Sequence, residues 1–135
     1  MVRRAEKKYG DRVSHTFIHY PVLSHRFALP AARAAECANN QDKFAAFVDV
    51  IFAKQDSLGL KTWIEYAREA GVSDTARFSS CSLDTAPIRR VETGRQLGER
   101  NRLTGTPTVI VNGWRLPGTP SEARLFSLID SVACS

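Results

Sequence analysis

Hydrophobic residues recur along most of this chain at the three- and four-residue spacing of amphipathic helices. The clearest stripe lies in the segment from about 42 to 54, where apolar side chains follow the i, i+3, i+4, i+7, i+8 pattern of a helix that buries one face. Its members are Phe44, Phe47, Val48, Ile51 and Phe52. Similar patterns and helix-ending glycines predict further helices at about 5–9, 27–39, 61–70, 74–81 and 86–103, and after Thr119.

Two glycines interrupt the helix predicted over 86–103. Gly94 and Gly98 lie on the same face as Val91, and each costs about 1 kcal/mol relative to alanine inside a helix. Close approach of the helix to a sheet would account for that cost. Pro87 fits the first turn of this helix, where its missing N–H has no intrahelical partner.

Two segments are typical of strands. Residues 13–20 are apolar without strict alternation and stop at Pro21, which predicts a strand covered on both faces. Residues 104–113 read Thr-Gly-Thr-Pro-Thr-Val-Ile-Val-Asn-Gly. A tight Gly-Thr-Pro bend therefore precedes a β-branched strand that ends in an Asn-Gly hairpin signal. A proline in this position is a good candidate for a cis peptide bond.

The start of the last helix is predicted from a capping pattern. Thr119 and Glu122 have the spacing of a capping box, and Pro120 would occupy the first helical position. The predicted order is helix, strand, helical insert, helix, strand, hairpin, strand and helix, which is an α/β arrangement.

The chain has 135 residues, a hydrophobic content of 43% and a net charge of +5. This length fits a single domain, 1–135, with a proper core.

We expect no membrane contact, because no stretch approaches the roughly 18 unbroken apolar residues of a membrane helix. We expect no nucleic-acid partner, because the basic residues are scattered and lack interleaved aromatic side chains. The first residues do not resemble a secretory signal, and the compartment stays unknown.

Three cysteines are widely separated along the sequence. Cys37, Cys81 and Cys134 have neither metal-ligand nor Cys-x-x-Cys spacing, and an odd count leaves at least one thiol free or intermolecular. Each stands among small or apolar neighbours, so we interpret each as a small hydrophobe, without assigning its disulfide state.

Other chemistry finds little support. The three histidines, His15, His19 and His25, have no carboxylate or cysteine at ligand spacing, so no metal is expected. No serine-hydrolase elbow and no phosphate-binding glycine loop occurs. The sequence calls for no cofactor.

Five pieces, in order, resemble one known family. They are Lys8–Asp11, His19–Leu23, His25–Ala38, Gln41 with Phe44, and Gly105–Thr108 followed by Val111–Gly113. They resemble the DsbA-like branch of the thioredoxin superfamily, in which a helical subdomain interrupts a thioredoxin fold. The resemblance covers nearly the whole chain. It implies a helical insert at about 24–84 and a substrate-binding cis-proline loop at Gly105, Thr106 and Pro107.

The chain departs from this family at the catalytic position. Family members carry Cys-x-x-Cys where a central strand meets the first helix, and the resemblance aligns Val2–Tyr9 with the later part of that helix. The catalytic dithiol and its strand are therefore expected to be missing from this N-terminally incomplete chain. The missing strand would lie between 13–20 and 108–111. Three arrangements remain open: the flanking strands close on each other, a second chain covers them, or the natural polypeptide is longer.

Three functions follow from the resemblance. The first is a thiol–disulfide oxidoreductase domain that acts on protein thiols but is inactive as given. The second is a redox-inert module that holds an extended peptide or a partner subunit at Thr106-Pro107, as a homo-oligomer if the chain is complete. The third is a glutathione-binding relative with serine in place of cysteine. That class also keeps its nucleophile at the first helix start.

Overall fold

The computed structural model describes residues 1–133 and divides the chain into two compact units. We call His19–Arg100 the helical unit, and Met1–Ile18 together with the residues from Asn101 onward the terminal unit. The helical unit contains α2 (Ala28–Asn39), α3 (Phe44–Ala53), η2 (Gln55–Ser57), α4 (Trp63–Glu69), α5 (Thr75–Leu83) and α6 (Arg89–Arg100). The terminal unit contains α1 (Val2–Tyr9), η1 (Gly10–Arg12), β1 (Ile110–Val111), β2 (Trp114–Arg115) and α7 (Glu122–Ala133).

The predicted helices are confirmed, with ends that differ by a few residues. The helix expected from about Asp42 begins at Phe44, because Asp42 has a φ of 58° and cannot continue a right-handed helix. The helix expected from about Ala86 begins at Arg89, so Pro87 precedes the helix.

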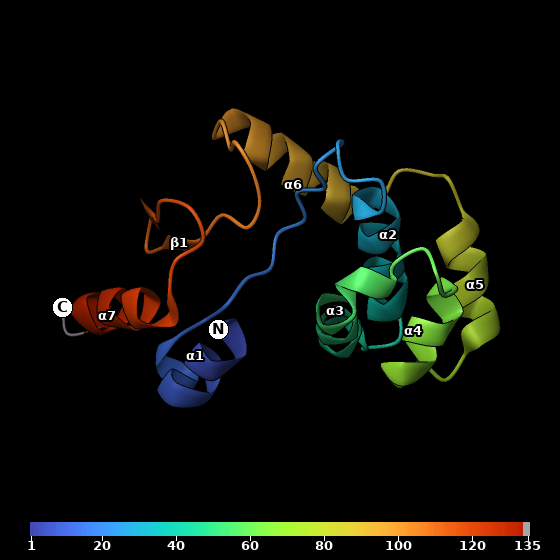
Figure 1. Ribbon diagram of the computed structural model, residues 1–135, viewed down its shortest axis with the longest axis horizontal. Coiled ribbons are helices and arrows are strands. Elements are labelled where there is room, and N and C mark those ends of the chain that lie inside the picture. The colour runs from blue at the N-terminus through green and yellow to red at the C-terminus, as the bar shows by residue number, and fades with distance from the viewer. Residues whose placement is uncertain (134–135) are drawn as a thin grey trace. The chain divides into compact units, whose positions relative to one another are not determined.

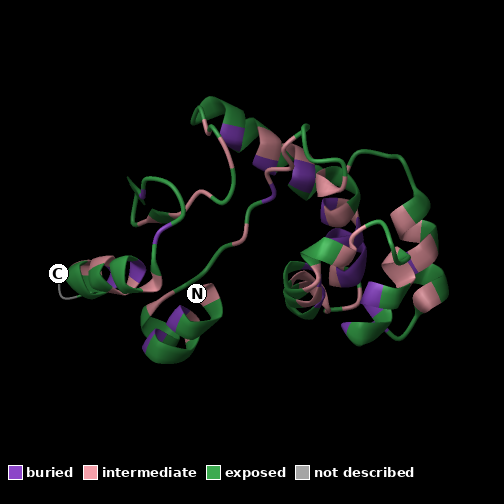
Figure 2. Cartoon of the chain, viewed as in Figure 1, coloured by how far each residue is buried: buried purple, intermediate pink, exposed green. Residues whose placement is uncertain are grey.

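The helical unit has its own hydrophobic core. Helices α2, α3, α4 and α5 lie side by side (Figure 1) and pack in the pairs α2–α3, α3–α4, α4–α5 and α2–α5. Most small residues on α2 are buried, and Figure 2 shows purple positions along this helix; they are Ala32, Ala34, Ala35, Cys37 and Ala38. They allow close approach of the large buried rings of Phe47, Tyr66 and Phe78. A stripe of alanines therefore works here as a packing surface for aromatic side chains.

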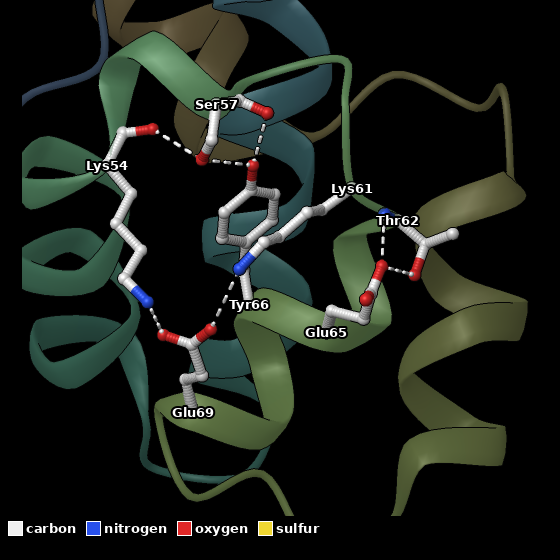
Figure 3. Close-up of polar contacts among 7 residues, drawn as sticks. All are labelled: Lys54, Ser57, Lys61, Thr62, Glu65, Tyr66 and Glu69. Atoms are coloured by element: carbon white, nitrogen blue, oxygen red, sulfur yellow. Dashed lines mark hydrogen bonds and ion pairs between the residues drawn. The ribbon is translucent and has the colours of Figure 1, made fainter.

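Polar contacts fix the loop between α3 and α4 against the buried ring of Tyr66 (Figure 3). The Tyr66 hydroxyl donates to the Ser57 carbonyl at 2.7 Å, and the Ser57 hydroxyl donates to the Lys54 carbonyl at 2.9 Å. The Glu69 carboxylate pairs with Lys54 and, at 3.6 Å, with Lys61. Hydrogen bonding from Lys54 lowers the pKa of Glu69 below its usual value.

A capping box begins α4. The Thr62 backbone N–H donates to Glu65 Oε2 at 2.8 Å, and the Thr62 hydroxyl donates to the same oxygen at 3.1 Å. These hydrogen bonds, the backbone one first, lower the pKa of Glu65. The N-terminal turn of α4 is thus closed by its own side chains.

The two glycines of α6 face the extended segment at the start of the helical unit. A Cβ on Gly94 would lie 1.9 Å from the His19 carbonyl oxygen, and one on Gly98 would lie 2.4 Å from the Tyr20 ring. The predicted close approach is therefore present. Its partner is the His19–Tyr20 backbone and ring, in place of the sheet that we expected.

The terminal unit is built around α1 and α7. Its buried core comprises Ala5, Tyr9, Leu116, Leu125 and Ile129. The Tyr9 hydroxyl lies 2.8 Å from Asp130 Oδ1 and 3.2 Å from the Phe126 carbonyl. Tyr9 of α1 therefore contacts α7 through its hydroxyl and through its ring, which packs edge-on against Phe126.

The Asn-Gly hairpin is confirmed. Ile110 pairs with Arg115 and Val111 pairs with Trp114 in an antiparallel ladder. Asn112 and Gly113 form the two-residue loop, and both have positive φ, 47° and 84°. This is the backbone geometry of a type I′ turn, which the Asn-Gly pair favours.

The strand predicted over residues 13–20 is wrong. Within residues 1–133 this segment forms no β-strand, although Val13 has extended backbone angles of −131° and 126°. The β-ladder of the described residues joins β1 and β2. An extended, apolar segment becomes a strand only where a neighbouring strand supplies the ladder hydrogen bonds.

The predicted capping box of the last helix is also wrong. Helix α7 begins at Glu122, and the Arg124 backbone N–H donates to the Ser121 hydroxyl at 3.2 Å. Ser121 therefore caps the helix, two residues later than the predicted Thr119, and Pro120 stays outside it. Serine is as good a cap as threonine, so the spacing alone did not distinguish them.

Candidate functional site

The loop predicted to bind substrate lies in the terminal unit, between α6 and β1. The peptide bond between Thr106 and Pro107 is cis. Thr106 and Pro107 are exposed, while Gly105 is partly buried. The loop therefore presents two of its three candidate residues to solvent.

Side-chain and backbone hydrogen bonds hold the loop at its strand end. The Thr108 hydroxyl donates to the Gly105 carbonyl at 2.8 Å, which closes the bend across Pro107. The Leu116 backbone N–H donates to the Val109 carbonyl at 2.9 Å and extends the hairpin pairing toward the loop. A local hydrogen bond from threonine to a carbonyl three residues earlier is typical of such turns.

Two of the three cysteines form a disulfide within the helical unit. The 135 residues contain no Cys-x-x-Cys. Cys37 of α2 and Cys81 of α5 form a disulfide within the helical unit, with Cα atoms 5.8 Å apart. The sequence left the disulfide state of these two residues open, and the structure joins them to each other, within or against the hydrophobic core of this unit. Cys134 lies outside the described residues.

Sequence reasoning missed this disulfide for a simple reason. Cys37 and Cys81 are 44 residues apart on two separate helices, and helical periodicity gives the buried face of each helix without saying which helices pack together. Connectivity cannot be read from cysteine spacing of this kind. The sequence signal was limited to the placement of both cysteines among small and apolar neighbours.

A buried polar cluster was also missed. His19 Nε2 lies 2.8 Å from Glu36 Oε1, and both residues are buried. Arg90 Nη1 lies 3.1 Å from the same oxygen and is itself half-exposed. Glu36 stands one turn after the buried Ala32 on α2. A carboxylate on the buried stripe of a helix indicates a polar partner, and this signal was available in the sequence.

The histidines do not gather into a metal site. In the terminal unit, His15 Nδ1 lies 3.1 Å from Glu6 Oε1. Burial acts to raise the pKa of the Glu6 carboxyl, but Arg3 and His15 outweigh it and hold that pKa below its usual value. In the part of the chain that the structure describes, no group of three potential ligands surrounds a common point. His15 and His19 instead each lie within hydrogen-bonding distance of one glutamate.

A small cavity lies in the helical unit between α2 and the beginning of α6. It has a volume of about 140 Å³ and is lined mainly by Leu29, Ile88, Val91 and Pro87, with Arg33 and Glu92 adding charge. Ligand pockets usually measure about 300–1,000 Å³. This cavity is too small to hold a peptide or a drug-sized ligand.

Comparisons with known proteins agree with the motifs. A family model described as thioredoxin matches residues 2–131. The Na(+)/H(+) antiporter NhaA of Herminiimonas arsenicoxydans is 35% identical over 123 residues, which are 91% of this chain and 19% of that protein. The Na(+)/H(+) antiporter NhaA 3 of Salinispora tropica is 32% identical over 124 residues, 91% of this chain and 19% of that protein. The Na(+)/H(+) antiporter NhaA 1 of Mycolicibacterium vanbaalenii is 30% identical over 125 residues, which are 91% of this chain and 20% of that protein.

The chain belongs to the thioredoxin superfamily, as a DsbA-like protein. It spans about a fifth of the length of the curated relatives it matches. No solved structure matches it. Among the described residues, no helix has both the length and the apolar content needed to cross a membrane.

Proposed function

We propose that this chain is a DsbA-like thiol–disulfide oxidoreductase domain whose redox-active Cys-x-x-Cys is absent from its 135 residues. As given, it binds substrate without exchanging electrons through a catalytic dithiol. The observation that carries this proposal is the thioredoxin match over residues 2–131 in a sequence with no Cys-x-x-Cys.

The missing chemistry depends on a helix start. A cysteine at a helix N-terminus has its thiolate stabilised by free backbone N–H groups and by the helix dipole. That thiolate attacks a substrate disulfide and forms a mixed disulfide. In our proposal α2 to α5 form the helical insert of one thioredoxin-like domain.

The candidate substrate-binding residues are Gly105, Thr106 and Pro107. The exposure of Thr106 and Pro107 supports this role, because an extended polypeptide needs an accessible backbone beside which to lie. The substrate class in this proposal is a protein thiol or an extended peptide segment.

An insulin-reduction assay tests the proposal. The chain should give no turnover above the rate of the thiol reductant alone, and Pro107→Ala should leave that background rate unchanged. Turnover that depends on the chain and is abolished by Pro107→Ala would contradict the absence of dithiol activity. Circular dichroism of both proteins ensures that the comparison is made between folded chains.

The second candidate function is a redox-inert binding module. Two apolar side chains on the hairpin next to the loop support it, since Ile110 is 52% exposed and Trp114 is 69% exposed. Exposed aromatic and aliphatic residues are common at protein interfaces. The match to about a fifth of proteins named as Na(+)/H(+) antiporters also supports a domain that accompanies a larger partner.

This candidate predicts self-association or a stable complex. Sedimentation analysis should show a dimer that Trp114→Ala weakens, while Leu60→Ala should leave association unchanged. Leu60 is a suitable control because it is 82% exposed and belongs to the helical unit. A folded monomer at all concentrations would count against self-association.

A further inference from the structure

Three interactions hold α2, and the loop after it, against α5 and the loop after α5. At one end, the Gln41 side chain donates to the Asp74 carbonyl at 3.0 Å and accepts from the Asp74 N–H at 3.1 Å. In the middle, the Cys37–Cys81 disulfide joins the helices. At the other end, Arg33 Nη2 donates to the Ala86 carbonyl at 2.7 Å. The disulfide is the covalent member of this series.

The two cysteines of this disulfide differ in their exposure to solvent. Cys37 is 1% exposed and belongs to the core that contains Phe47 and Phe78. Cys81 is partly exposed, and the exposed Asn40 places its Nδ2 at 3.8 Å from Cys81 Sγ. Of the two residues, Cys81 is therefore the one that a dissolved thiol meets first. Access decides which sulfur of a disulfide is attacked.

We propose that the Cys37–Cys81 bond is a redox-cleavable clamp on the helical unit, opened by soluble thiols that attack Cys81 and release Cys37. In the first step a thiolate RS⁻ bonds to Cys81 Sγ, the Sγ–Sγ bond breaks, and Cys37 leaves as a thiolate that takes up a proton. In the second step another RS⁻ attacks the sulfur of the bound R group. This releases RSSR and the Cys81 thiolate, so two thiols supply the two electrons.

The structure also indicates what opening the clamp changes. The disulfide closes a loop that contains α3 and α4, and cross-links of this length restrict the unfolded chain. After reduction, Asp74 still accepts from the Arg77 N–H at 2.9 Å and still binds Gln41. The beginning of α5 therefore stays attached, while its end, from about Ser79 to Leu83, loses its covalent link and keeps only the exposed hydrogen bond from Arg33 to the Ala86 carbonyl beyond it.

Two single-cysteine proteins test the direction of attack, both carrying Cys134→Ser so that no third thiol reacts. Cys37→Ala leaves Cys81 as the only thiol, and Cys81→Ala leaves Cys37. With an aromatic disulfide reagent under native conditions, Cys81 should react about tenfold faster or more, because the rate follows access to the sulfur. In denaturant the two rates should become similar. Equal native rates in proteins with native circular dichroism would overturn the proposal.

A measurement on the disulfide-bonded Cys134→Ser protein keeps the test independent of those variants. The folded protein is treated with a monothiol, quenched with acid and mapped by mass spectrometry. The mixed disulfide should be found on Cys81. A mixed disulfide on Cys37, or no cleavage before global unfolding, would overturn the proposal.

Hydrogen exchange then tests the structural consequence. Full reduction should accelerate amide exchange at residues 79–83 more than at 75–78. Uniform acceleration over α5, or none, would overturn the proposed release of its end. Neither result depends on the substrate-binding role of Thr106 and Pro107.

Discussion

The carbonyl oxygen of His19 lies where a side chain on Gly94 would begin, 1.9 Å from the position of its Cβ. No β-carbon can be accommodated at this distance, so the backbone of the 19–20 segment rests directly on α6. The cost of a glycine inside the helix is explained by this contact, which positions the first residues of the helical unit.

Gly94→Ala should therefore destabilise the protein. Alanine gains about 1 kcal/mol of helix propensity, but overpacking against a fixed backbone costs about 1–3 kcal/mol, and the His19 carbonyl can move only with its chain. Urea unfolding should show a lower free energy of unfolding than in the unmodified protein.

Gly98→Ala is the matched control for that substitution. Its Cβ would meet the Tyr20 ring, at 2.4 Å from two ring carbons, and a ring can rotate away where a backbone cannot. Gly98→Ala should cost less than Gly94→Ala. The reverse order would contradict the proposed fixed contact with His19.

Glu36→Ala should also destabilise the helical unit. Removing this carboxylate leaves the buried His19 ring without its 2.8 Å partner, and a buried polar group that loses its hydrogen bond costs about 1–3 kcal/mol. Chemical unfolding measures the loss. Glu92→Ala, which removes only a more exposed pair with Arg95, should change stability by less than about 1 kcal/mol.

The capping box at Thr62 and Glu65 predicts a pH-dependent contribution to stability. The Thr62 backbone N–H lowers the pKa of Glu65 in the folded protein, whereas an unfolded glutamate titrates at about 4.3. A lowered folded pKa stabilises the fold above the unfolded value, and this contribution is lost as the pH falls through the folded pKa.

Glu65→Gln should accordingly lower stability at neutral pH and have little effect in strong acid. Unfolding curves of the two proteins should converge as the pH falls below about 4. The control is Glu99→Gln, at an exposed residue whose ion pair with Arg95 is long, at 3.8 Å. A difference between Glu65→Gln and the unmodified protein that stays constant with pH would contradict the account.

Gly113→Ala should weaken the hairpin. Gly113 has a φ of 84°. A residue with a Cβ is less stable by about 1–2 kcal/mol in this left-handed region of the backbone. Gly105→Ala is the control, because Gly105 is outside that region and a Cβ there would meet nothing within 4 Å. Thermal unfolding should show a larger loss for Gly113→Ala, and equal losses would argue against the turn geometry.

Local patterns in the sequence predicted local structure well. The apolar stripe from Phe44 to Ile51 predicted α3 correctly, because an amphipathic helix can bury its apolar face against any apolar neighbour. Asn112-Gly113 predicted the hairpin correctly, because these two residues favour the positive φ angles of its turn. The Gly-Thr-Pro bend was recognised in the same way, from residues that act on their own backbone.

Features that depend on distant partners could not be predicted. The apolar segment around Phe17 forms no strand within the described residues, since strand formation requires a neighbouring ladder that sequence periodicity does not supply. The pairing of Cys37 with Cys81, and of His19 with Glu36, depends on which helices pack together. Ser121 in place of Thr119 as the cap of α7 is a smaller error, between two residues of nearly equal capping strength.

The central claim is that Thr106 and Pro107 bind extended polypeptide in a chain that lacks the catalytic dithiol. A titration with an unfolded, cysteine-free peptide, followed by amide chemical shifts, tests it most directly. We predict shifts that saturate and that centre on Thr106 and Thr108, together with loss of binding in Thr106→Pro but not in Leu60→Ala. A folded protein whose loop amides do not respond to saturating peptide would contradict the claim.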